Sequence, residues 1–299
     1  MAPQPAAAPA PPAPSLLQST TRFASLPLSP QTQQAMAQGF GYEYCTPVQE
    51  KSIPVALQGY DVLARARTGT GKTLGFLIPA IESLVASGER VQPGTCAILV
   101  LSPTRELSTQ ISTEAKTLLR FHSGIAVQLM MGGTNAEKER RQMMGAGPST
   151  LLVATPGRLE DHLTNTQGFA QRFLGLRTFV LDEADQMLDM GFRPTITKIL
   201  AALPPPATRQ TLLFSATVPT EMQQIAAKAL RPGDQQRFVD CVGEGAEATV
   251  RPPSAPPAPA AACGCGVRLR TVPCLALLCL TLKRFVCPLL PLLEIARWT

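Results

Sequence analysis

A glycine-rich turn between a short apolar run and a helix-like stretch constrains this chain more than any other feature. The turn reads Ala66-Arg67-Thr68-Gly69-Thr70-Gly71-Lys72-Thr73 and follows the apolar residues 61–64. Backbone N–H groups in such a turn close around phosphate oxygens, and the next helix adds the positive end of its dipole. Lys72 is expected to reach the β/γ-phosphates, and the Thr73 hydroxyl to hold Mg²⁺. The general pattern has Gly at its first position, where this chain has Ala66.

A second motif, Asp182-Glu183-Ala184-Asp185, follows the apolar residues 178–181. Mg²⁺ takes oxygen ligands and keeps several waters, so Asp182 suits the metal side of a phosphate site. Glu183 suits polarising the attacking water. The alternative is that both carboxylates cap a helix over residues 184–190, and the two interpretations can hold together. Because ligands of open α/β sheets lie at the carboxyl ends of the strands, the two motifs are expected to converge on one nucleoside triphosphate.

Eight segments in one order, over about two-thirds of the chain, resemble the motifs of the DEAD-box RNA helicases. They are Phe23, Gly41-Tyr42-Glu43-Tyr44-Cys45-Thr46-Pro47-Val48-Gln49, the glycine-rich turn, Pro103-Thr104-Arg105-Glu106-Leu107, Gly132-Gly133, Thr155-Pro156-Gly157-Arg158, the acidic tetrad and Ser215-Ala216-Thr217. That family builds its active site between two RecA-like lobes, and every matched segment belongs to the first. No His-Arg-x-Gly-Arg-type segment, which supplies the family's arginine fingers, follows Thr217. The resemblance therefore implies an N-terminal RecA-like lobe without the second lobe.

The same resemblance implies ATP with Mg²⁺ as the bound nucleotide. A Gln amide can donate to adenine and accept from its exocyclic amine, and Gln49 resembles the family's adenine-reading glutamine. Phe23 resembles the aromatic residue that stacks on the base, although a Phe before a helix is as often packed against it. The expected cofactor site consists of Phe23, Gln49, Arg67, Thr68, Gly69, Thr70, Gly71, Lys72 and Thr73, with Thr73 and Asp182 on the metal.

Three of the segments are expected to contact an RNA strand. The residues in question are Thr104, Arg105, Gly132, Gly133, Thr155, Gly157 and Arg158. Their hydroxyls, guanidinium groups and bare N–H groups suit phosphate and sugar contacts, which hold a strand without reading its bases. RNA binding is therefore expected to be independent of sequence. The alternative is ordinary turn chemistry, with Arg105 as a solvated helix start.

The last segment offers a link between the two sites. Ser215 and Thr217 follow the apolar residues 211–214 and could hydrogen-bond Asp185, which the resemblance implies would couple nucleotide state to RNA binding. In the alternative, Ser215 or Thr217 caps a helix that starts near Pro219.

Apolar runs alternate with helix-like stretches over the middle of the chain. The runs cover residues 61–64, 97–101, 125–130, 151–154, 178–181 and 211–214. The helix-like stretches cover residues 72–86, 105–120, 136–144, 195–202 and 220–230. Runs this uniformly apolar indicate strands buried on both faces. The expected fold class is α/β, a RecA-like P-loop domain whose parallel sheet carries helices on both faces.

Composition divides the chain into three parts. Residues 1–21 are expected to form a disordered Pro/Ala-rich arm, 22–250 the lobe, and 251–299 a Pro/Ala linker with a Cys-rich tail of no recognisable fold. Of the net charge of +6, residues 1–250 carry +1 (21 Lys and Arg against 20 Asp and Glu) and residues 251–299 carry +5 (6 against 1). Bulk charge therefore does not single out the lobe as a binder of nucleic acid.

The tail resembles no part of the family and suggests a truncated or misread helicase. Its uncharged stretches, 271–282 and 285–293, are shorter than a membrane span. Its cysteines lack paired C-x-x-C spacing, so we expect neither a membrane anchor nor a zinc site. Without a secretory signal near Met1, an intracellular soluble protein is expected, its compartment open.

The sequence thus predicts the ATP-binding and RNA-binding first lobe of a DEAD-box helicase, with Lys72, Asp182 and Glu183 as catalytic residues. ATP hydrolysis would be coupled to RNA duplex unwinding in the complete enzyme and be weak or absent in this chain alone. A non-catalytic fragment that holds nucleotide or RNA is the alternative, and a P-loop ATPase unrelated to RNA is a more remote one. Protein cofactors and the RNA target are not identified by the sequence.

Overall fold

The six apolar runs form six neighbouring parallel strands of one sheet. The strands are β1 (Asp61–Arg65), β2 (Cys96–Leu101), β3 (Ile125–Met130), β4 (Ser149–Ala154), β5 (Thr178–Leu181) and β6 (Gln210–Ser215). Their order in the sheet is β3-β4-β2-β5-β6-β1, followed by β7 (Gln236–Asp240) and β8 (Val250–Arg251). Only β8 pairs antiparallel among these strands. Every residue of β2, β5 and β6 is buried, as in a sheet covered on both faces.

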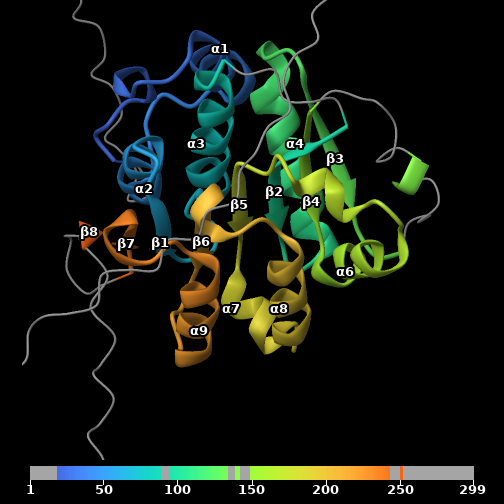
Figure 1. Cartoon of the computed structure of the whole chain (residues 1–299). Coiled ribbons are helices and arrows are strands. Elements are labelled where there is room, and N and C mark those ends of the chain that lie inside the picture. The colour runs from blue at the N-terminus through green and yellow to red at the C-terminus, as the bar shows by residue number, and fades with distance from the viewer. Residues whose placement is uncertain (1–18, 89–93, 134–138, 142–148, 243–249, 252–299) are drawn as a thin grey trace, which may run out of the picture. The chain divides into compact units, whose positions relative to one another are not determined.

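The computed structural model describes residues 19–88, 94–133, 139–141, 149–242 and 250–251 (Figure 1). They lie within one compact unit, Met1–Ala255. The expectations for residues 1–18, for 252–299 and for most of the stretch 136–144 fall outside the described residues. In the part of the chain that is described, no helix is long and apolar enough to span a membrane.

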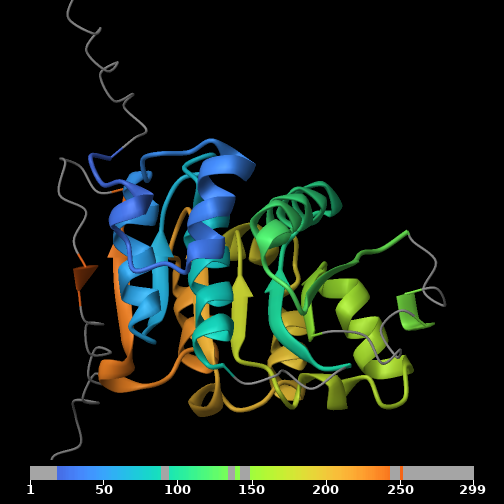
Figure 2. The same cartoon turned by 90° about the horizontal axis from the view of Figure 1, so that it is seen from above.

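Helices cover both faces of the sheet, which confirms the predicted fold class. Their bounds are α1 (Pro30–Gln34), α2 (Pro47–Leu57), α3 (Lys72–Ala86), α4 (Arg105–Leu118), α6 (Pro156–Asn165), α7 (Ala184–Asp189), α8 (Arg193–Ala202) and α9 (Thr220–Ala229). Shorter helices are η1 (Phe23–Ser25), η2 (Ala35–Phe40), η3 (Leu119–Phe121), η4 (Ala170–Phe173), η5 (Pro206–Thr208) and η6 (Gly233–Gln235). Helices α1 to α4 lie on one side of the strands and α6 to α9 on the other (Figure 1). From above, the first group lies over the strands (Figure 2).

Two hydrophobic clusters follow from this layering. Alternate residues of each strand point to opposite faces, so Ile98 and Val100 pack with α2, α3 and α4 in one cluster. Leu99 and Leu101 pack with α6, α7, α8 and α9 in the other. The strands therefore lie between two apolar layers.

Several elements were not predicted from the sequence. One is α2, which has Thr46 at its N-cap and Gln49 completing a capping box. Likewise, Pro156 opens α6, because Pro is favoured at the first helical position. The strand β7 was not predicted from the sequence.

The expected domain boundaries also shift. Residues 19–21, assigned to the arm, are tied to the lobe: the Ser19 N–H donates to the Cys45 carbonyl, and the Cys45 N–H donates to the Thr21 carbonyl, both at 2.8 Å. Arg251, assigned to the tail, lies on β8.

The strand order sorts the motifs into two groups at the carboxyl edge of the sheet. Strands β1, β6 and β5 are neighbours, so residues 66–73, 182–185 and 215–217 lie together; we call this the β1–β5–β6 half. Strands β2, β4 and β3 are neighbours too, and residues 103–107, 131–133 and 155–158 form the β2–β3–β4 half. Motifs far apart in the chain are thereby brought onto one edge.

Candidate functional site

The glycine-rich turn joins β1 to α3 with two left-handed residues, Gly69 (φ 74°) and Gly71 (φ 88°). A Cβ at Gly71 would lie 2.6 Å from Nε2 of Gln49, so this position needs glycine for space as well as for conformation. Ala66, the departure from the general pattern, is fully buried, and its N–H donates to the Ser215 carbonyl at 2.9 Å. That position continues the pairing of β1 with β6, so nothing in the structure requires a glycine there.

Lys72 begins α3 and points into the β1–β5–β6 half. Its side chain is only 5% exposed, and its Nζ lies 3.6 Å from Oε1 of Glu183. Among the described residues no hydrogen-bond acceptor meets this ammonium group. A buried charge without hydrogen bonds is costly. Phosphate oxygens would supply the missing acceptors, so the turn and Lys72 together fit a polyphosphate.

Asp182 and Glu183 face this ammonium group from the end of β5. Asp182 is 2% exposed, and its Oδ1 accepts from the Glu183 N–H at 3.0 Å. Burial raises the pKa of Asp182 to about 7, with Lys72 lowering it and Glu183 raising it. In the described segments no group of three or more His, Cys, Asp or Glu side chains is arranged to hold a metal. Thr73 and Asp182 nevertheless suit Mg²⁺, because this ion takes phosphate oxygens and waters for its remaining ligands.

The structure does not favour the capping alternative for the acidic pair. Glu183 occupies the N-cap position of α7, but its side chain makes no cap hydrogen bond. Its φ of 49° makes it the one non-glycine residue with positive φ in the described parts of the chain. Non-glycine residues in this conformation are strained and gather at functional sites. The strain here leaves the carboxylate facing Lys72.

Asp185 is bonded to the segment that follows β6. Its Oδ2 accepts from the backbone N–H and the hydroxyl of Thr217, both at 2.9 Å, and its own N–H donates to Oγ of Ser215 at 3.2 Å. Burial opposes ionisation of Asp185, but hydrogen bonds from Ser215 and Thr217 hold its pKa below the ordinary value. The capping alternative is wrong, because Pro219 is the N-cap of α9 and no side chain caps that helix.

Gln49 is turned inward. Its Oε1 accepts from the Thr46 N–H and its Nε2 donates to the Gly71 carbonyl, both at 2.9 Å. The side chain is 3% exposed. It thereby holds the glycine-rich turn against α2. Adenine recognition by Gln49 stays a prediction, because the side-chain amide would have to exchange its bonds to Thr46 and Gly71 for bonds to the base.

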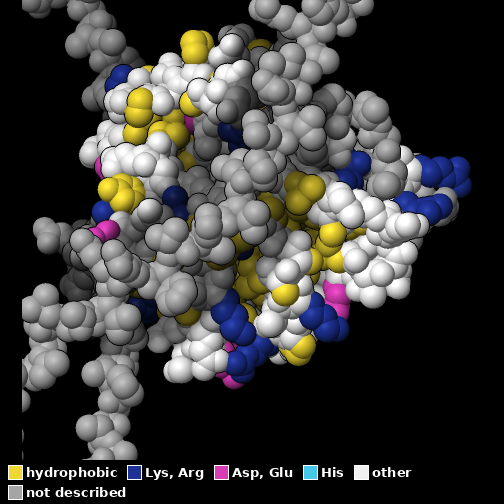
Figure 3. All heavy atoms as spheres, viewed as in Figure 1, with side chains coloured by type: hydrophobic (Ala, Val, Ile, Leu, Met, Phe, Trp, Pro, Cys, Tyr) yellow, Lys and Arg dark blue, Asp and Glu magenta, His cyan; other side chains and the backbone are white. Residues whose placement is uncertain are grey.

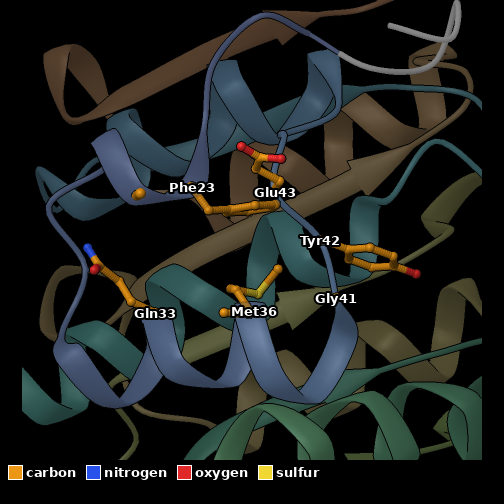
Figure 4. A pocket seen from close by; sticks show the side chains of 8 residues that line it. Phe23, Gln33, Met36, Gly41, Tyr42 and Glu43 are labelled. Atoms are coloured by element: carbon orange, nitrogen blue, oxygen red, sulfur yellow. The ribbon is translucent and has the colours of Figure 1, made fainter. Parts of the chain in front are cut away.

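A cavity of about 370 Å³ lies beside η1 and η2 (Figure 4). Its lining consists of Phe23, Ala24, Gln33, Met36, Ala37, Gly41, Tyr42 and Glu43. Phe23 also belongs to the hydrophobic cluster around α3, so the same side chain packs in the core and lines the cavity. Ligand pockets of this size and mainly apolar character are common. Gln49 is not among the residues that line this cavity, so joint contact of Phe23 and Gln49 with adenine stays a prediction.

In the β2–β3–β4 half, Arg105 and the two glycines come together. Thr104 is the N-cap of α4, its hydroxyl accepting from the Leu107 N–H at 3.2 Å. Arg105 is exposed at the helix start, and a Cβ on Gly133 would lie 2.5 Å from its Nη1. The absence of side chains at Gly132 and Gly133 therefore leaves the space that the guanidinium occupies. Arg105 thus packs over the two glycines although it is exposed.

Arg158 is held by protein groups on three sides. Its Nε donates to the Met131 carbonyl at 3.2 Å and lies 3.5 Å from Oε2 of Glu139, and its Nη1 lies 3.5 Å from Oδ2 of Asp161. Thr155, the N-cap residue of α6, is 9% exposed and makes no cap bond with its side chain. Around Gly157 there is open space. Of these residues, Gly157 leaves its backbone most accessible.

Lys and Arg side chains do not form one broad surface on the face that Figure 3 shows. On the face seen in Figure 3, Lys and Arg lie in several separate small groups. The lobe's balance of +1 agrees with this. RNA contact would therefore depend on local groups such as Arg105.

Two carboxylates near the site were not predicted. The charge of Glu114 on α4 helps to raise the pKa of Asp182, and Glu139 contacts both Arg158 and His162. Asp182 is 68 residues from Glu114, and Arg158 and His162 are 19 and 23 residues from Glu139, so only the folded sheet brings these groups together. The one local signal is the pairing of Glu114 with Gln110 four residues earlier.

The comparisons with known proteins agree with this arrangement. DEAD-box ATP-dependent RNA helicase 26 of Arabidopsis thaliana is 51% identical over 235 residues, covering 77% of this chain and 27% of that protein. Its namesake in Oryza sativa subsp. japonica is 50% identical over 231 residues, covering 77% and 41%. The chain thus spans less than half the length of these relatives.

A solved structure shows the same fold. The crystal structure of a DEAD box protein from the hyperthermophile Methanococcus jannaschii matches with a TM-score of 0.61 and 32% identity, covering 73% of this chain and 55% of that one. The family model described as DEAD/DEAH box helicase matches residues 46–225, which span α2 to α9 and both halves of the carboxyl edge. With more than half of its residues matched, the chain belongs to the DEAD/DEAH box helicase family.

Proposed function

We propose that this chain binds ATP with Mg²⁺ in the β1–β5–β6 half and one RNA strand along the β2–β3–β4 half, as the first lobe of an ATP-dependent RNA helicase. The observation that carries the proposal is the Lys72 ammonium group, 5% exposed and without a hydrogen-bond acceptor among the described residues. The names of the relatives, ATP-dependent RNA helicases, support it.

The residues divide the work on the nucleotide as follows. Backbone N–H groups of Arg67, Thr68, Gly69, Thr70 and Gly71 surround the phosphates, and Lys72 donates to their oxygens. Thr73 and Asp182 would hold Mg²⁺, which when bound would supply positive charge beside the phosphates. Glu183 orients the attacking water and accepts its proton.

Asp185 would couple the nucleotide site to RNA binding. It lies two residues after Glu183 and hydrogen-bonds Ser215 and Thr217. A movement of Glu183 would thus be transmitted to the end of β6. RNA would be held by Thr104, Arg105, Gly132, Gly133, Thr155, Gly157 and Arg158, through phosphate and sugar contacts that are independent of sequence.

We propose further that hydrolysis by these 299 residues alone is slow. Phosphoryl transfer relies on positive charge around the γ-phosphate, and Lys72 is the cation that the described residues supply there. The competing proposal is a fragment that binds nucleotide or RNA without catalysis. The two proposals share the nucleotide site and differ only in whether ATP is turned over.

Calorimetry with ATP and GTP in the presence of Mg²⁺ tests the nucleotide site. ATP should bind more tightly than GTP, and Gln49→Ala should remove the difference between them. Gln49 also holds Gly71. If Gln49→Ala only loosened the glycine-rich turn, the affinities for ATP and for GTP would both fall and their ratio would stay the same. Equal affinity in the unmodified chain would contradict the adenine assignment, and no binding of either nucleotide would contradict the proposed function.

A further inference from the structure

Glu139 is a charged residue buried against α6. It opens the described residues 139–141 and is only 7% exposed. Its Oε2 lies 3.5 Å from Nε of Arg158 and 3.3 Å from Nε2 of His162. Arg158 and His162 are four residues apart on α6, so their side chains lie on the same face of that helix. A buried carboxylate is costly unless it is paired and hydrogen-bonded, and here one oxygen meets both partners.

His162 holds this carboxylate from the interior of the protein. Its ring is buried, with the ring centroid 5.3 Å from that of Phe169. Its Nδ1 lies 3.0 Å from Oγ1 of Thr166. An ionised carboxylate only accepts hydrogen bonds, so Nε2 of His162 carries the proton that faces Glu139. The Glu139 side chain is therefore fixed from behind, and its remaining contact is with Arg158.

Arg158 joins two segments that we propose to contact RNA. Its Nε donates to the carbonyl of Met131, which directly precedes Gly132-Gly133. Arg158 itself directly follows Thr155-Pro156-Gly157, at the start of α6. Asp161 also faces Arg158, with Oδ2 3.5 Å from Nη1, but its side chain is 45% exposed, so water competes for that contact. Glu139 is thus the buried carboxylate that holds the guanidinium between the two segments.

We propose that Glu139 is a positioning residue for RNA binding, which acts through Arg158 to hold the segment after β3 against the start of α6. This inference rests on the proposed function, because it requires an RNA strand along the β2–β3–β4 half. The sign of the effect separates positioning from bulk charge. RNA is a polyanion, so removal of a carboxylate that acted only through its charge would strengthen binding. Removal of a positioning carboxylate weakens it.

The test is the affinity of the full chain for a fluorescently labelled oligouridylate, measured by anisotropy. Glu139→Ala should weaken binding by about 10-fold, because the charge-assisted contact that holds Arg158 is lost. Glu139→Gln keeps one acceptor without the charge, so its affinity should lie between those of Glu139→Ala and the parent. Calorimetric affinity for the non-hydrolysable ATP analogue AMPPNP should stay at the parent value in both variants, since the β1–β5–β6 half is intact.

A double variant tests whether Glu139 acts through Arg158. Arg158→Ala should weaken RNA binding, and adding Glu139→Gln should cause no further loss, because residues that act as a unit are not additive. Glu160→Gln is the matched control. It removes a carboxylate from the same helix, where Glu160 pairs with Lys198 of α8 at 2.6 Å, and it should not weaken RNA binding.

The outcomes distinguish this inference from the proposed function. If the parent binds RNA and Glu139→Gln binds it equally or more tightly, the inference alone is overturned. Additive losses in the double variant also overturn it, as does a Glu139→Gln variant that loses affinity for AMPPNP together with RNA, which would indicate a role in folding only. A parent chain that binds no RNA overturns the proposed function and this inference with it. Should Glu139→Ala fail to fold, Glu139→Gln decides the outcome.

Discussion

The charged side chains of the two halves of the carboxyl edge differ in burial and in hydrogen bonding. In the β1–β5–β6 half, Lys72 and Asp182 are 5% and 2% exposed, and the ammonium group has no hydrogen-bond acceptor in the described part of the chain. In the β2–β3–β4 half, Arg105 is exposed over two glycines, and Arg158 is held by a carbonyl and two carboxylates.

The two halves therefore differ in what a ligand must supply. In the first half the Lys72 ammonium group faces the Glu183 carboxylate but lacks hydrogen-bond acceptors among the described residues, which phosphate oxygens would supply. In the second half Arg158 is already bonded to protein groups, so a strand of RNA would compete with those contacts, whereas Arg105 is exposed. We therefore expect changes in the first half to act mainly on nucleotide chemistry, and changes in the second to act mainly on RNA affinity.

The largest expected effect concerns turnover. A missing arginine finger typically costs about 10³–10⁵ in rate, so the chain should bind ATP but hydrolyse it very slowly, with little stimulation by RNA. Adding a separately expressed second lobe of a related helicase should raise the phosphate release rate. Lys72→Ala or Glu183→Gln should abolish that gain. RNA-stimulated turnover by the chain alone, at rates typical of a complete enzyme, would contradict the prediction.

The next effect concerns RNA. Arg105→Ala should weaken binding of single-stranded RNA of any sequence and reduce the slope of log affinity against log salt by about one. AMPPNP affinity should not change. Arg120→Ala removes the same charge beyond the other end of α4 and serves as the control. Equal RNA affinity in the parent and in Arg105→Ala, measured by fluorescence anisotropy, would remove Arg105 from the RNA side.

A smaller effect separates two glycines of the same turn. Gly69 and Gly71 both have positive φ, but only Gly71 has neighbours within 4 Å of an added Cβ. Both Ala variants should lose about 1–2 kcal/mol of unfolding free energy from the left-handed conformation. Gly71→Ala should lose more, because Gln49 must move. Urea unfolding that gives equal losses would show that Gln49 does not brace the turn.

The smallest effect is a pH dependence at Asp185. Its folded pKa is lowered, so its contribution to stability is present above the ordinary value of about 3.9 and is lost as pH falls through the folded pKa. Asp185→Asn should therefore be slightly less stable than the parent at pH 7, with the gap closing in acid. Asp189→Asn, on the exposed end of α7, is the control. A gap that stays constant with pH in urea unfolding would contradict the assignment.

Local pattern predicted the strands well but could not predict partners. Runs such as 97–101 are apolar throughout and lie in the middle of the sheet, so burial alone determines them. The start of α2 was missed, because Thr46 and Pro47 suit a turn and a helix N-terminus equally. The strand β7 has only one fully buried residue, Val239, and lacks a distinctive pattern.

At the site, residue identities were predictable and their contacts were not. The resemblance pointed to Gln49, yet its amide bonds Thr46 and Gly71. Glu139 carries no motif of its own, and only the fold brings it to Arg158 and His162. Both depend on the approach of elements that are distant in sequence.

The proposed function requires that Lys72 be kept for a ligand and not for the fold. Thermal unfolding of the parent and of Lys72→Met, with and without Mg²⁺ and AMPPNP, tests it most directly, with Lys228→Met on the exposed side of α9 as the control. Without nucleotide, Lys72→Met should unfold at a temperature no lower than the parent, because a buried ammonium group without acceptors is removed. With nucleotide, the parent and the control should gain stability and Lys72→Met should not. A Lys72→Met variant that unfolds several degrees lower without nucleotide and gains as much as the parent with it would contradict the claim.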